Sequence, residues 1–252
     1  MLTLYNFAQS TCSQKVRLVL WEKDIPFTDH LVDHKTREHL TDWYLKLNPN
    51  GVVPTLVHDD NVIIDSSVIM EYLDEVFPQV PMVPRDPVGR AHMRKWLRWM
   101  EEVPTAAIRV PSFNKYLSRR YANMSEAEFA KMAANHPIRK QFYQRMAKEN
   151  GFDERDTAES LDRLQQTVDR VEKTLAGHGK PWIMGDALTL ADPCLMPTID
   201  RMNDLGLARM WADRPNVAAW YARYGERPAF KKTYYPGTRL TEIFEKPPAA
   251  AE

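Results

Sequence analysis

Three hydroxyl groups and a thiol follow one another near the N-terminus, in the stretch Ser10-Thr11-Cys12-Ser13. An apolar, alternating run precedes the stretch, and apolar residues at helical spacing follow it. The pattern places these side chains between the end of a strand and the first turn of a helix. Free backbone N–H groups and the positive end of the helix dipole stabilise an anion or a thiolate there. The same residues also suit a helix N-cap, so the chemical interpretation needs support from elsewhere in the chain.

Two further pairs of residues supply that support. Val53-Pro54 opens a predicted strand, where a proline is tolerated if its missing N–H faces an edge or a ligand. Asp65-Ser66 precedes an apolar stripe and caps a predicted helix. Both pairs lie within the first 80 residues, as does the hydroxyl-rich stretch.

The elements that must position these residues form a β-α-β-α-β-β-α series over residues 1–80. The turn sequence Asn48-Pro49-Asn50-Gly51 separates its two halves. The predicted strands are residues 2–7, 27–32, 52–57 and 62–64. A proline-rich linker follows, and from residue 90 the pattern is helical, with one long amphipathic helix predicted to end at Gly177. We expect the last regular helix to stop before Arg227-Pro228, and residues 247–252 to be disordered.

Composition narrows the classes of function. The 252 residues include 34 Lys and Arg and 34 Asp and Glu, so net charge favours neither a nucleic-acid nor a membrane partner. No run of about 18 apolar residues predicts a membrane span, and no basic and apolar leader pattern opens the sequence. The two cysteines, Cys12 and Cys194, form no disulfide framework, so we expect a reduced, cytoplasmic setting. We find no metal-ligand spacing.

The hydroxyl-rich turn, Val53-Pro54 and Asp65-Ser66, followed by a helical half, resemble the cytosolic glutathione transferase family. The resemblance implies an α/β plus all-α fold, in which a thioredoxin-like domain precedes an all-helical domain. The implied boundaries are 1–80 for the glutathione-binding domain, 81–89 for the linker, 90–236 for the helical domain with the electrophile site, and 237–252 for a C-terminal tail. It also implies a homodimer.

The resemblance assigns a role to each matching residue. Val53 would offer its backbone N–H and C=O to the cysteinyl part of glutathione, and Pro54 would be the family's cis-proline. Asp65 and Ser66 would hold the γ-glutamyl ammonium and carboxylate. His39 matches a histidine near the glycyl carboxylate in theta-like enzymes, although Lys46 could do the same work. Asp192, in a predicted capping box that starts at Thr189, is expected to stabilise the fold.

The group that contacts the glutathione sulfur stays open among three residues. Ser10 matches the hydroxyl of zeta-class enzymes, Cys12 the thiol of reductive dehalogenases, and Ser13 the serine of several theta-like classes. Ser13 is the first choice. Tyr5 lies where tyrosine-type transferases carry their phenol, but the turn that follows it matches the serine and cysteine classes better.

Segments 65–73, 124–129 and 150–152 resemble the bacterial β-aryl-etherases of lignin breakdown. The favoured function is therefore attack by glutathione thiolate on a small aromatic electrophile, with cleavage of a β-aryl ether. The alternatives are general glutathione conjugation, a Cys12-dependent reductive dehalogenase or isomerase, and a binding protein for glutathione or an aromatic ligand without turnover. The candidates for lining the electrophile pocket are Met93, Trp96, Trp99, Met100, Arg109, Phe113 and Tyr116.

Overall fold

The computed structural model describes residues 1–245, so the expected disorder of residues 247–252 lies outside the described range. A four-stranded sheet in the order β2-β1-β3-β4 organises the first part of the chain. Strand β1 pairs parallel with β2 and antiparallel with β3, which forms a hairpin with β4. The elements of this part are β1 (Leu2–Asn6), α1 (Thr11–Glu22), β2 (Thr28–Leu31), the 3-10 turn η1 (Glu38–Leu40), α2 (Asp42–Leu47), β3 (Thr55–His58), β4 (Asn61–Ile64) and α3 (Ser66–Val76).

The second part of the chain is helical. Its elements are α4 (Pro87–Glu102), α5 (Pro104–Ala107), α6 (Arg109–Lys115), η2 (Leu117–Tyr121), α7 (Glu126–Asn135), α8 (Lys140–Arg145), α9 (Glu154–His178), α10 (Ala191–Asp204), η3 (Ala208–Trp211), α11 (Pro215–Gly225), α12 (Pro228–Thr233) and α13 (Leu240–Phe244). Among the described residues, no helix is long and apolar enough to cross a membrane. The sheet part and the helical part confirm the predicted fold class.

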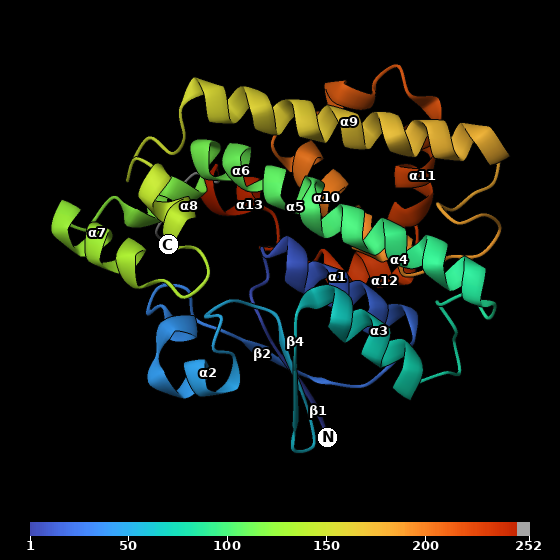
Figure 1. Ribbon diagram of the computed structural model, residues 1–252, viewed down its shortest axis with the longest axis horizontal. Helices are drawn as coiled ribbons and strands as arrows, with labels where there is room; N and C mark the ends of the chain where they lie inside the picture. The colour runs from blue at the N-terminus through green and yellow to red at the C-terminus, as the bar shows by residue number, and fades with distance from the viewer. Residues whose placement is uncertain (246–252) are drawn as a thin grey trace, which may run out of the picture.

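Helix α1 joins the two parts. It packs against α3 on the sheet side and against α10 and α12 of the helical part (Figure 1). Its residues from Ser13 to Leu20 are all buried, as expected for a helix covered on several sides. The Nζ of Lys15, also buried, pairs with Glu101 Oε1 of α4 at 2.6 Å and donates to Thr105 Oγ1 at 3.0 Å. The position of the α1 N-terminus is therefore fixed from both parts of the chain.

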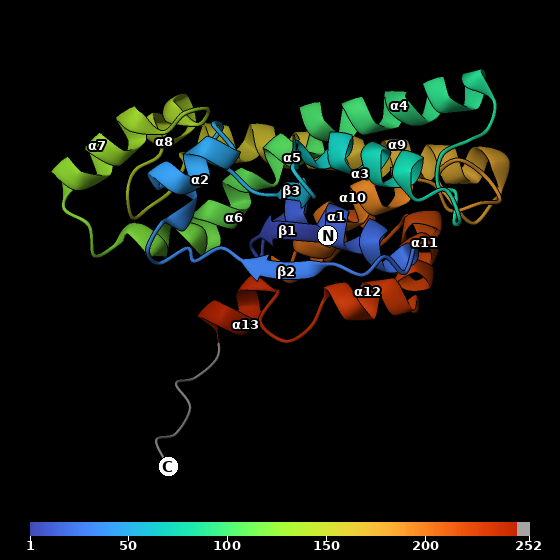
Figure 2. The ribbon, with the colours of Figure 1, turned by 90° about the horizontal axis from the view of Figure 1, so that it is seen from below.

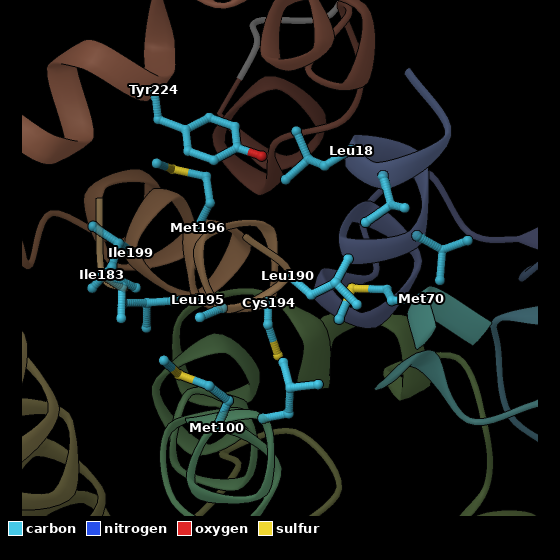
Figure 3. Close-up of a cluster of buried hydrophobic side chains, with 14 of the residues drawn as sticks. Leu18, Met70, Met100, Ile183, Leu190, Cys194, Leu195, Met196, Ile199 and Tyr224 are labelled. Atoms are coloured by element: carbon cyan, nitrogen blue, oxygen red, sulfur yellow. The ribbon is translucent and has the colours of Figure 1, made fainter. Parts of the chain in front are cut away.

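One hydrophobic core extends across the junction between the two parts. Side chains of α1, α3, α4 and α10 meet in it, with Leu18, Met70 and Met100 around Cys194 (Figure 3). At close-packed density, this core leaves little freedom for α1 to shift relative to the helical part. The rigid core thus supports the first turn of α1.

Several helix ends differ from the prediction. Helix α9 ends at His178, and the residue with left-handed backbone is Gly179 (φ 62°) rather than Gly177. Helices α12 and α13 follow the helix that we expected to be the last, and α13 lies within the predicted tail. Helix α10 begins at Ala191 without a side-chain cap from Thr189. Helices as short as α12 and α13 depend on tertiary contacts for their stability, and a local sequence pattern does not show these contacts.

The segment with α2 lies next to α7 and α8 at one end of the molecule, and α13 lies beyond the end of β2 (Figures 1 and 2). The loops that leave β1 and β2 point toward this end. The N-terminus of α1 therefore lies between the sheet and the helices α7, α8 and α13 (Figures 1 and 2).

Candidate active site

The hydroxyl-rich stretch forms the start of α1, as predicted. Ser10 is the N-cap, in extended conformation, and its Oγ accepts a hydrogen bond from the Ser13 backbone N–H at 3.3 Å. A serine hydroxyl has one proton to donate besides its acceptor sites. The Ser10 hydroxyl can therefore cap the helix and still donate to an anion in front of it.

An inner cavity of about 120 Å³ opens at this helix start. Residues of the sheet part and of the helical part line it together, namely Phe7, Gln9, Ser10, Thr11, Cys12, His34, His39, Gly51, Val52, Val53, Ile108, Arg109, Ser112, Phe113, Leu117, Arg120, Tyr121, His136, Arg139, Tyr143 and Arg201. The hydroxyl of Ser10 and the thiol of Cys12 thus share a cavity with aromatic and cationic side chains.

An outer cavity of about 690 Å³ shares several walls with the inner one, including Phe7, His39, Arg120 and Tyr143. Its remaining walls come from the segment after β2, from α7 and from α13, which contributes Ile243 and Phe244. It is large enough for a small aromatic molecule, and its walls are mainly apolar. The inner cavity thus provides a site that stabilises an anion, and the outer cavity provides a larger apolar space.

Ser13 does not reach either cavity. Its side chain is completely buried, and its Oγ accepts from the Phe7 backbone N–H at 3.4 Å. The geometry therefore does not place Ser13, the first choice from the sequence, at the cavity, because position 13 lies on the face of α1 that turns into the protein. Ser10 and Cys12 remain as candidates to contact a bound sulfur.

The two cysteines occupy different environments. Cys12 is half-buried and lines the inner cavity. Cys194 is completely buried in the core, where burial raises the pKa of its thiol to about 12 (Figure 3). A thiol in this state is not a nucleophile at neutral pH. Any thiol chemistry of this chain therefore belongs to Cys12.

His39 and Val53 both line the inner cavity. His39 is 7% exposed, its Nδ1 has no hydrogen-bond partner within residues 1–245, and burial together with the field of Arg139 lowers its pKa to about 4. The backbone N–H and C=O of Val53 also make no hydrogen bond in the described part of the chain. The bond from Val53 to Pro54 is cis. Lys46, the alternative to His39, is exposed and outside both linings.

Asp65 and Ser66 lie at the start of α3, outside the walls of the inner cavity. Asp65 is exposed, and its Oδ1 accepts from the Ser67 N–H at 2.9 Å and from the Val68 N–H at 3.3 Å. Ser66 is buried. The pair forms the predicted cap, but the structure does not bring it together with the residues of the cavity.

Of the seven residues predicted to line an electrophile pocket, Arg109 and Phe113 line the inner cavity. The other five candidates do not line either cavity, namely Met93, Trp96, Trp99, Met100 and Tyr116. Four of them belong to the buried core, and Trp99 packs against it. The Arg170 guanidinium of α9 also lies 4.1 Å from the ring centre of Trp99. The helical spacing of the four candidates on α4 therefore reflects the packing of this helix on its neighbours, and Tyr116 directly follows α6.

The cavity residues that sequence reasoning missed include Arg120, His136, Arg139, Tyr143 and Arg201. Most of them belong to residues 111–150, where charge is high and apolar periodicity is weak. Arginines interleaved with aromatic residues were the available signal. Within residues 1–245, no group of three or more His, Cys, Asp and Glu side chains could hold a metal ion.

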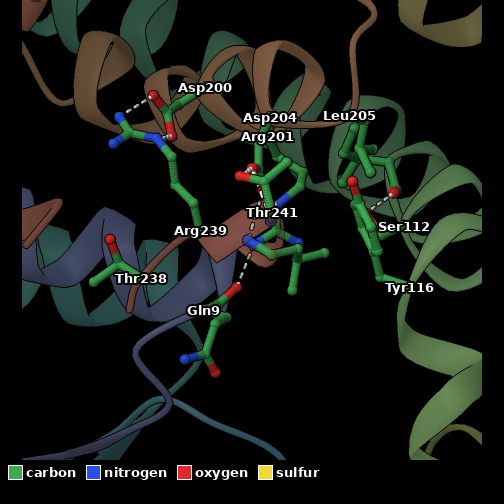
Figure 4. A network of polar contacts seen from close by, with 12 residues as sticks. Gln9, Ser112, Tyr116, Asp200, Arg201, Asp204, Leu205, Thr238, Arg239 and Thr241 are labelled. Carbon is green, nitrogen blue, oxygen red and sulfur yellow. Dashed lines mark hydrogen bonds and ion pairs between the residues drawn. The ribbon is translucent and has the colours of Figure 1, made fainter. Parts of the chain in front are cut away.

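A polar network connects the C-terminal segment to the α1 turn (Figure 4). The Arg201 guanidinium donates to the Gln9 carbonyl at 2.6 Å, and the Gln9 amide donates to the Gly237 carbonyl at 2.7 Å. The Asp204 carboxylate accepts from the Leu240 N–H and from the Thr241 hydroxyl, at 2.7 and 2.6 Å. Helix α13 is thus held against α10, where it closes one side of the outer cavity.

Comparisons with known proteins agree with this arrangement. The family models described as "Glutathione S-transferase, N-terminal domain" and "Glutathione S-transferase, C-terminal domain" match residues 9–76 and 132–234. Protein LigF of Sphingobium sp. (strain NBRC 103272 / SYK-6) is 31% identical over 92% of this chain and 93% of that protein. The tetrachloro-p-hydroquinone reductive dehalogenase of Sphingobium chlorophenolicum is 28% identical, over 91% of this chain and 94% of the enzyme.

A solved structure supports the same assignment. The crystal structure of the beta-etherase LigF from Sphingobium sp. strain SYK-6 superposes with a TM-score of 0.83 at 29% identity, and the match covers 92% of this chain and 98% of that one. The thioredoxin-like sheet, the helical second part and these matches agree along nearly the whole chain. The chain therefore belongs to the glutathione S-transferase family, a family of enzymes whose co-substrate is glutathione.

Proposed function

We propose that this enzyme cleaves β-aryl ether bonds of lignin-derived aromatic ketones. The sulfur of glutathione attacks the carbon next to the ketone and forms a C–S bond, while the C–O bond to the aryl group breaks and phenoxide leaves. The phenoxide then takes up a proton and is released as phenol. The observation that carries the proposal is the cavity in which the start of α1 meets aromatic and cationic side chains of the helical part. The similarity to LigF supports it.

In this proposal, the Ser10 hydroxyl donates a hydrogen bond to the glutathione sulfur, and the start of α1 adds its N–H groups and dipole. A free thiol has a pKa of about 8.5, and only the thiolate is an effective nucleophile. One hydrogen bond to a charged group is worth about 1.5–3 kcal/mol, which lowers a pKa by about one to two units. That shift makes a large part of the bound sulfur ionised at neutral pH.

The residues that the family resemblance named bind the rest of the glutathione molecule. Val53 pairs its free backbone N–H and C=O with the cysteinyl unit. The unpartnered His39 Nδ1 lies near the glycyl end, and Asp65 and Ser66 hold the γ-glutamyl end at the start of α3. The free backbone groups and the unpartnered histidine nitrogen fit a peptide ligand of this kind.

The Arg109 guanidinium, which lines the inner cavity together with Ser10 and Cys12, stabilises the negative charge that develops on the phenoxide and on the ketone oxygen. Because this charge is absent from the ether bond of the substrate and develops as the bond breaks, the interaction favours the transition state more than the substrate. Phe7 and Phe113 provide flat apolar surfaces for the aromatic rings.

The test is a reaction of the purified protein with glutathione and a β-aryl ether ketone. The proposal predicts equal amounts of phenol and of the glutathione thioether of the ketone. As a control, the same preparation is given 1-chloro-2,4-dinitrobenzene. Conjugation of this control without release of phenol would replace the proposal with general glutathione conjugation.

A second candidate function is reductive dehalogenation or cis–trans isomerisation through Cys12. The observation that favours it is the position of Cys12 in the inner cavity, together with the similarity to the dehalogenase of Sphingobium chlorophenolicum. Cys12→Ser would abolish such an activity and spare ether cleavage. Turnover of a tetrachlorohydroquinone that survives this substitution would rule the second function out.

We further propose that the enzyme is a cytoplasmic homodimer, with domain boundaries near residues 80 and 90. The unpaired Cys12 and Cys194 support a reducing compartment. Light scattering of the purified protein tests the dimer, and a mass of 29.3 kDa in solution would show a monomer instead.

A further inference from the structure

The inner cavity has an unbalanced charge. Four arginines line it, and no aspartate or glutamate belongs to its walls. Arg201 is compensated, because its Nε lies 3.6 Å from Asp204 and its Nη2 donates to a carbonyl. Within residues 1–245, Arg109, Arg120 and Arg139 form no ion pair with a carboxylate and donate no side-chain hydrogen bond to one. These three arginines are called the arginine cluster below.

The arginine cluster is assembled from separate elements. Arg109 opens α6, Arg120 lies in η2, and Arg139 directly precedes α8. All three are partly buried, and all three side chains reach one cavity. Burial and the neighbouring Arg139 lower the pKa of Arg109, which reflects the cost of holding these charges together. Removing an unpaired cation from water costs desolvation free energy, and a bound anion would offset this cost.

The histidines of the cavity do not add to this charge. Burial, together with the field of Arg120 or Arg139, lowers the pKa of His34 to about 3 and those of His39 and His136 to about 4. At neutral pH these side chains are uncharged, so the fixed positive charge belongs to the arginines alone. An arginine keeps its charge at any working pH.

The arginine cluster and the proposed glutathione site come from different parts of the chain. Ser10, His39 and Val53 belong to the sheet part, whereas the arginine cluster belongs to the helical part, which takes the electrophile. A transient charge on a leaving phenoxide would be served by one arginine. Arg109 meets that need, and the uncompensated charges of Arg120 and Arg139 match a ligand that carries a full negative charge before the reaction begins.

We propose that the electrophile of this enzyme is an anion, an aromatic ether that carries a carboxylate, and that Arg120 and Arg139 bind this carboxylate while Arg109 keeps its proposed role beside the leaving phenoxide. The planar guanidinium group donates two parallel N–H bonds to a carboxylate, which also orients the attached ring. The inference rests on the proposed function for the reaction at the ether bond. The preference for an anionic ligand does not depend on it.

The first experiment compares two β-aryl ether ketones that differ only in one substituent of the phenoxy ring, a carboxylate in one and a primary amide in the other. We expect kcat/KM to be at least 10-fold higher for the carboxylate. Arg120→Gln and Arg139→Gln should each remove most of this ratio. Arg119→Gln is the matched control, because Arg119 is the exposed neighbour of Arg120 and lines neither cavity.

The KM for glutathione separates the two binding sites. The inference predicts that Arg120→Gln and Arg139→Gln change the carboxylate-to-amide ratio and leave the KM for glutathione within about twofold. A loss that appears only in the KM for glutathione would overturn the inference, since the arginine cluster would then bind glutathione. Thermal unfolding of each variant shows whether it remains folded.

A second experiment keeps the test independent of ether cleavage. Phenoxyacetate and phenoxyacetamide are compared as inhibitors of 1-chloro-2,4-dinitrobenzene conjugation. Stronger inhibition by phenoxyacetate, lost in Arg120→Gln and kept in Arg119→Gln, would support an anion site even if no ether were cleaved. Equal inhibition by the two compounds would overturn the inference and leave the proposed ether cleavage intact.

Discussion

Replacement of Ser10 by alanine separates the role of this hydroxyl from that of its neighbours. Ser10 lies at the cavity and caps α1, whereas the Ser13 hydroxyl is buried against the Phe7 N–H. Ser10→Ala removes a proposed hydrogen bond to a thiolate, worth about 1.5–3 kcal/mol. If the bound thiol has a pKa of about 7 in the wild type and about 8.5 in the variant, its ionised fraction at pH 7 falls from about one half to about 3%. We expect a loss of about 15-fold in kcat/KM, which recovers as the pH is raised.

The assay is the pH profile of kcat/KM for 1-chloro-2,4-dinitrobenzene, with ultraviolet titration of the bound thiolate. Loss of the cap also costs about 1 kcal/mol of stability, so urea unfolding accompanies each variant. Ser10→Thr keeps a hydroxyl that can cap and donate, and it should retain most of the activity. An unchanged profile in Ser10→Ala, with a shifted profile in Ser13→Ala, would refute the reasoning.

The remaining predictions concern a thiol, a buried carboxylate and a histidine. Cys12→Ser should leave ether cleavage within about threefold of the wild type, because glutathione supplies the attacking sulfur; phenol release measures this. Asp192→Ala should cost more than about 3 kcal/mol in urea unfolding, since its buried carboxylate accepts from Trp220 Nε1 at 2.9 Å and from two backbone N–H groups. Because the pKa of His39 is about 4 in the folded state, against about 6.5 when unfolded, the unfolded chain binds more protons between these values. The free energy of unfolding should therefore fall as the pH drops from 6.5 to 4. His39→Gln should remove only part of this dependence, because the pKa values of His34 and His136 are lowered as well; an unchanged slope would contradict the assignment.

Local rules predicted the elements that carry the chemistry. The alternation of Leu2 and Leu4 predicted β1, the hydroxyl-rich turn predicted the start of α1, and Asp65 predicted the cap of α3. Each of these depends on neighbours within a few residues, which a sequence displays directly. The same rules do not tell which face of a buried helix turns toward a cavity. Ser13 was ranked first because it matches the serine of several theta-like classes, and the local pattern did not show that it lies on the inner face of α1.

The electrophile side depends on contacts that are distant in the sequence. Arg109, Arg120, Arg139 and Arg201 line one cavity because α6, η2, α8 and α10 converge there, and no local pattern encodes this convergence. The aromatic stripe of α4 was predicted to line a pocket, but Trp96 is a core residue. An apolar stripe shows that a helix is buried, and it does not show whether a neighbouring helix or a ligand covers it.

The C-terminal segment illustrates the same limit. Residues 237–252 were predicted to be a tail, yet Asp204 accepts hydrogen bonds from the start of α13 and fixes it against α10 (Figure 4). Helix α13 has five residues and would not be stable alone. Its side chains Ile243 and Phe244 complete the outer cavity. Tertiary contacts rather than helix propensity therefore determine the shape of the site.

A crystal structure of the enzyme with glutathione tests the central claim most directly. The account predicts that the glutathione sulfur lies within hydrogen-bond distance of Ser10 Oγ, and that the cysteinyl backbone pairs with the N–H and C=O of Val53. It also predicts that the arginine cluster stays free of glutathione and faces the electrophile side. A sulfur that contacts Ser13 instead, or glutathione carboxylates held by Arg120 and Arg139, would contradict it.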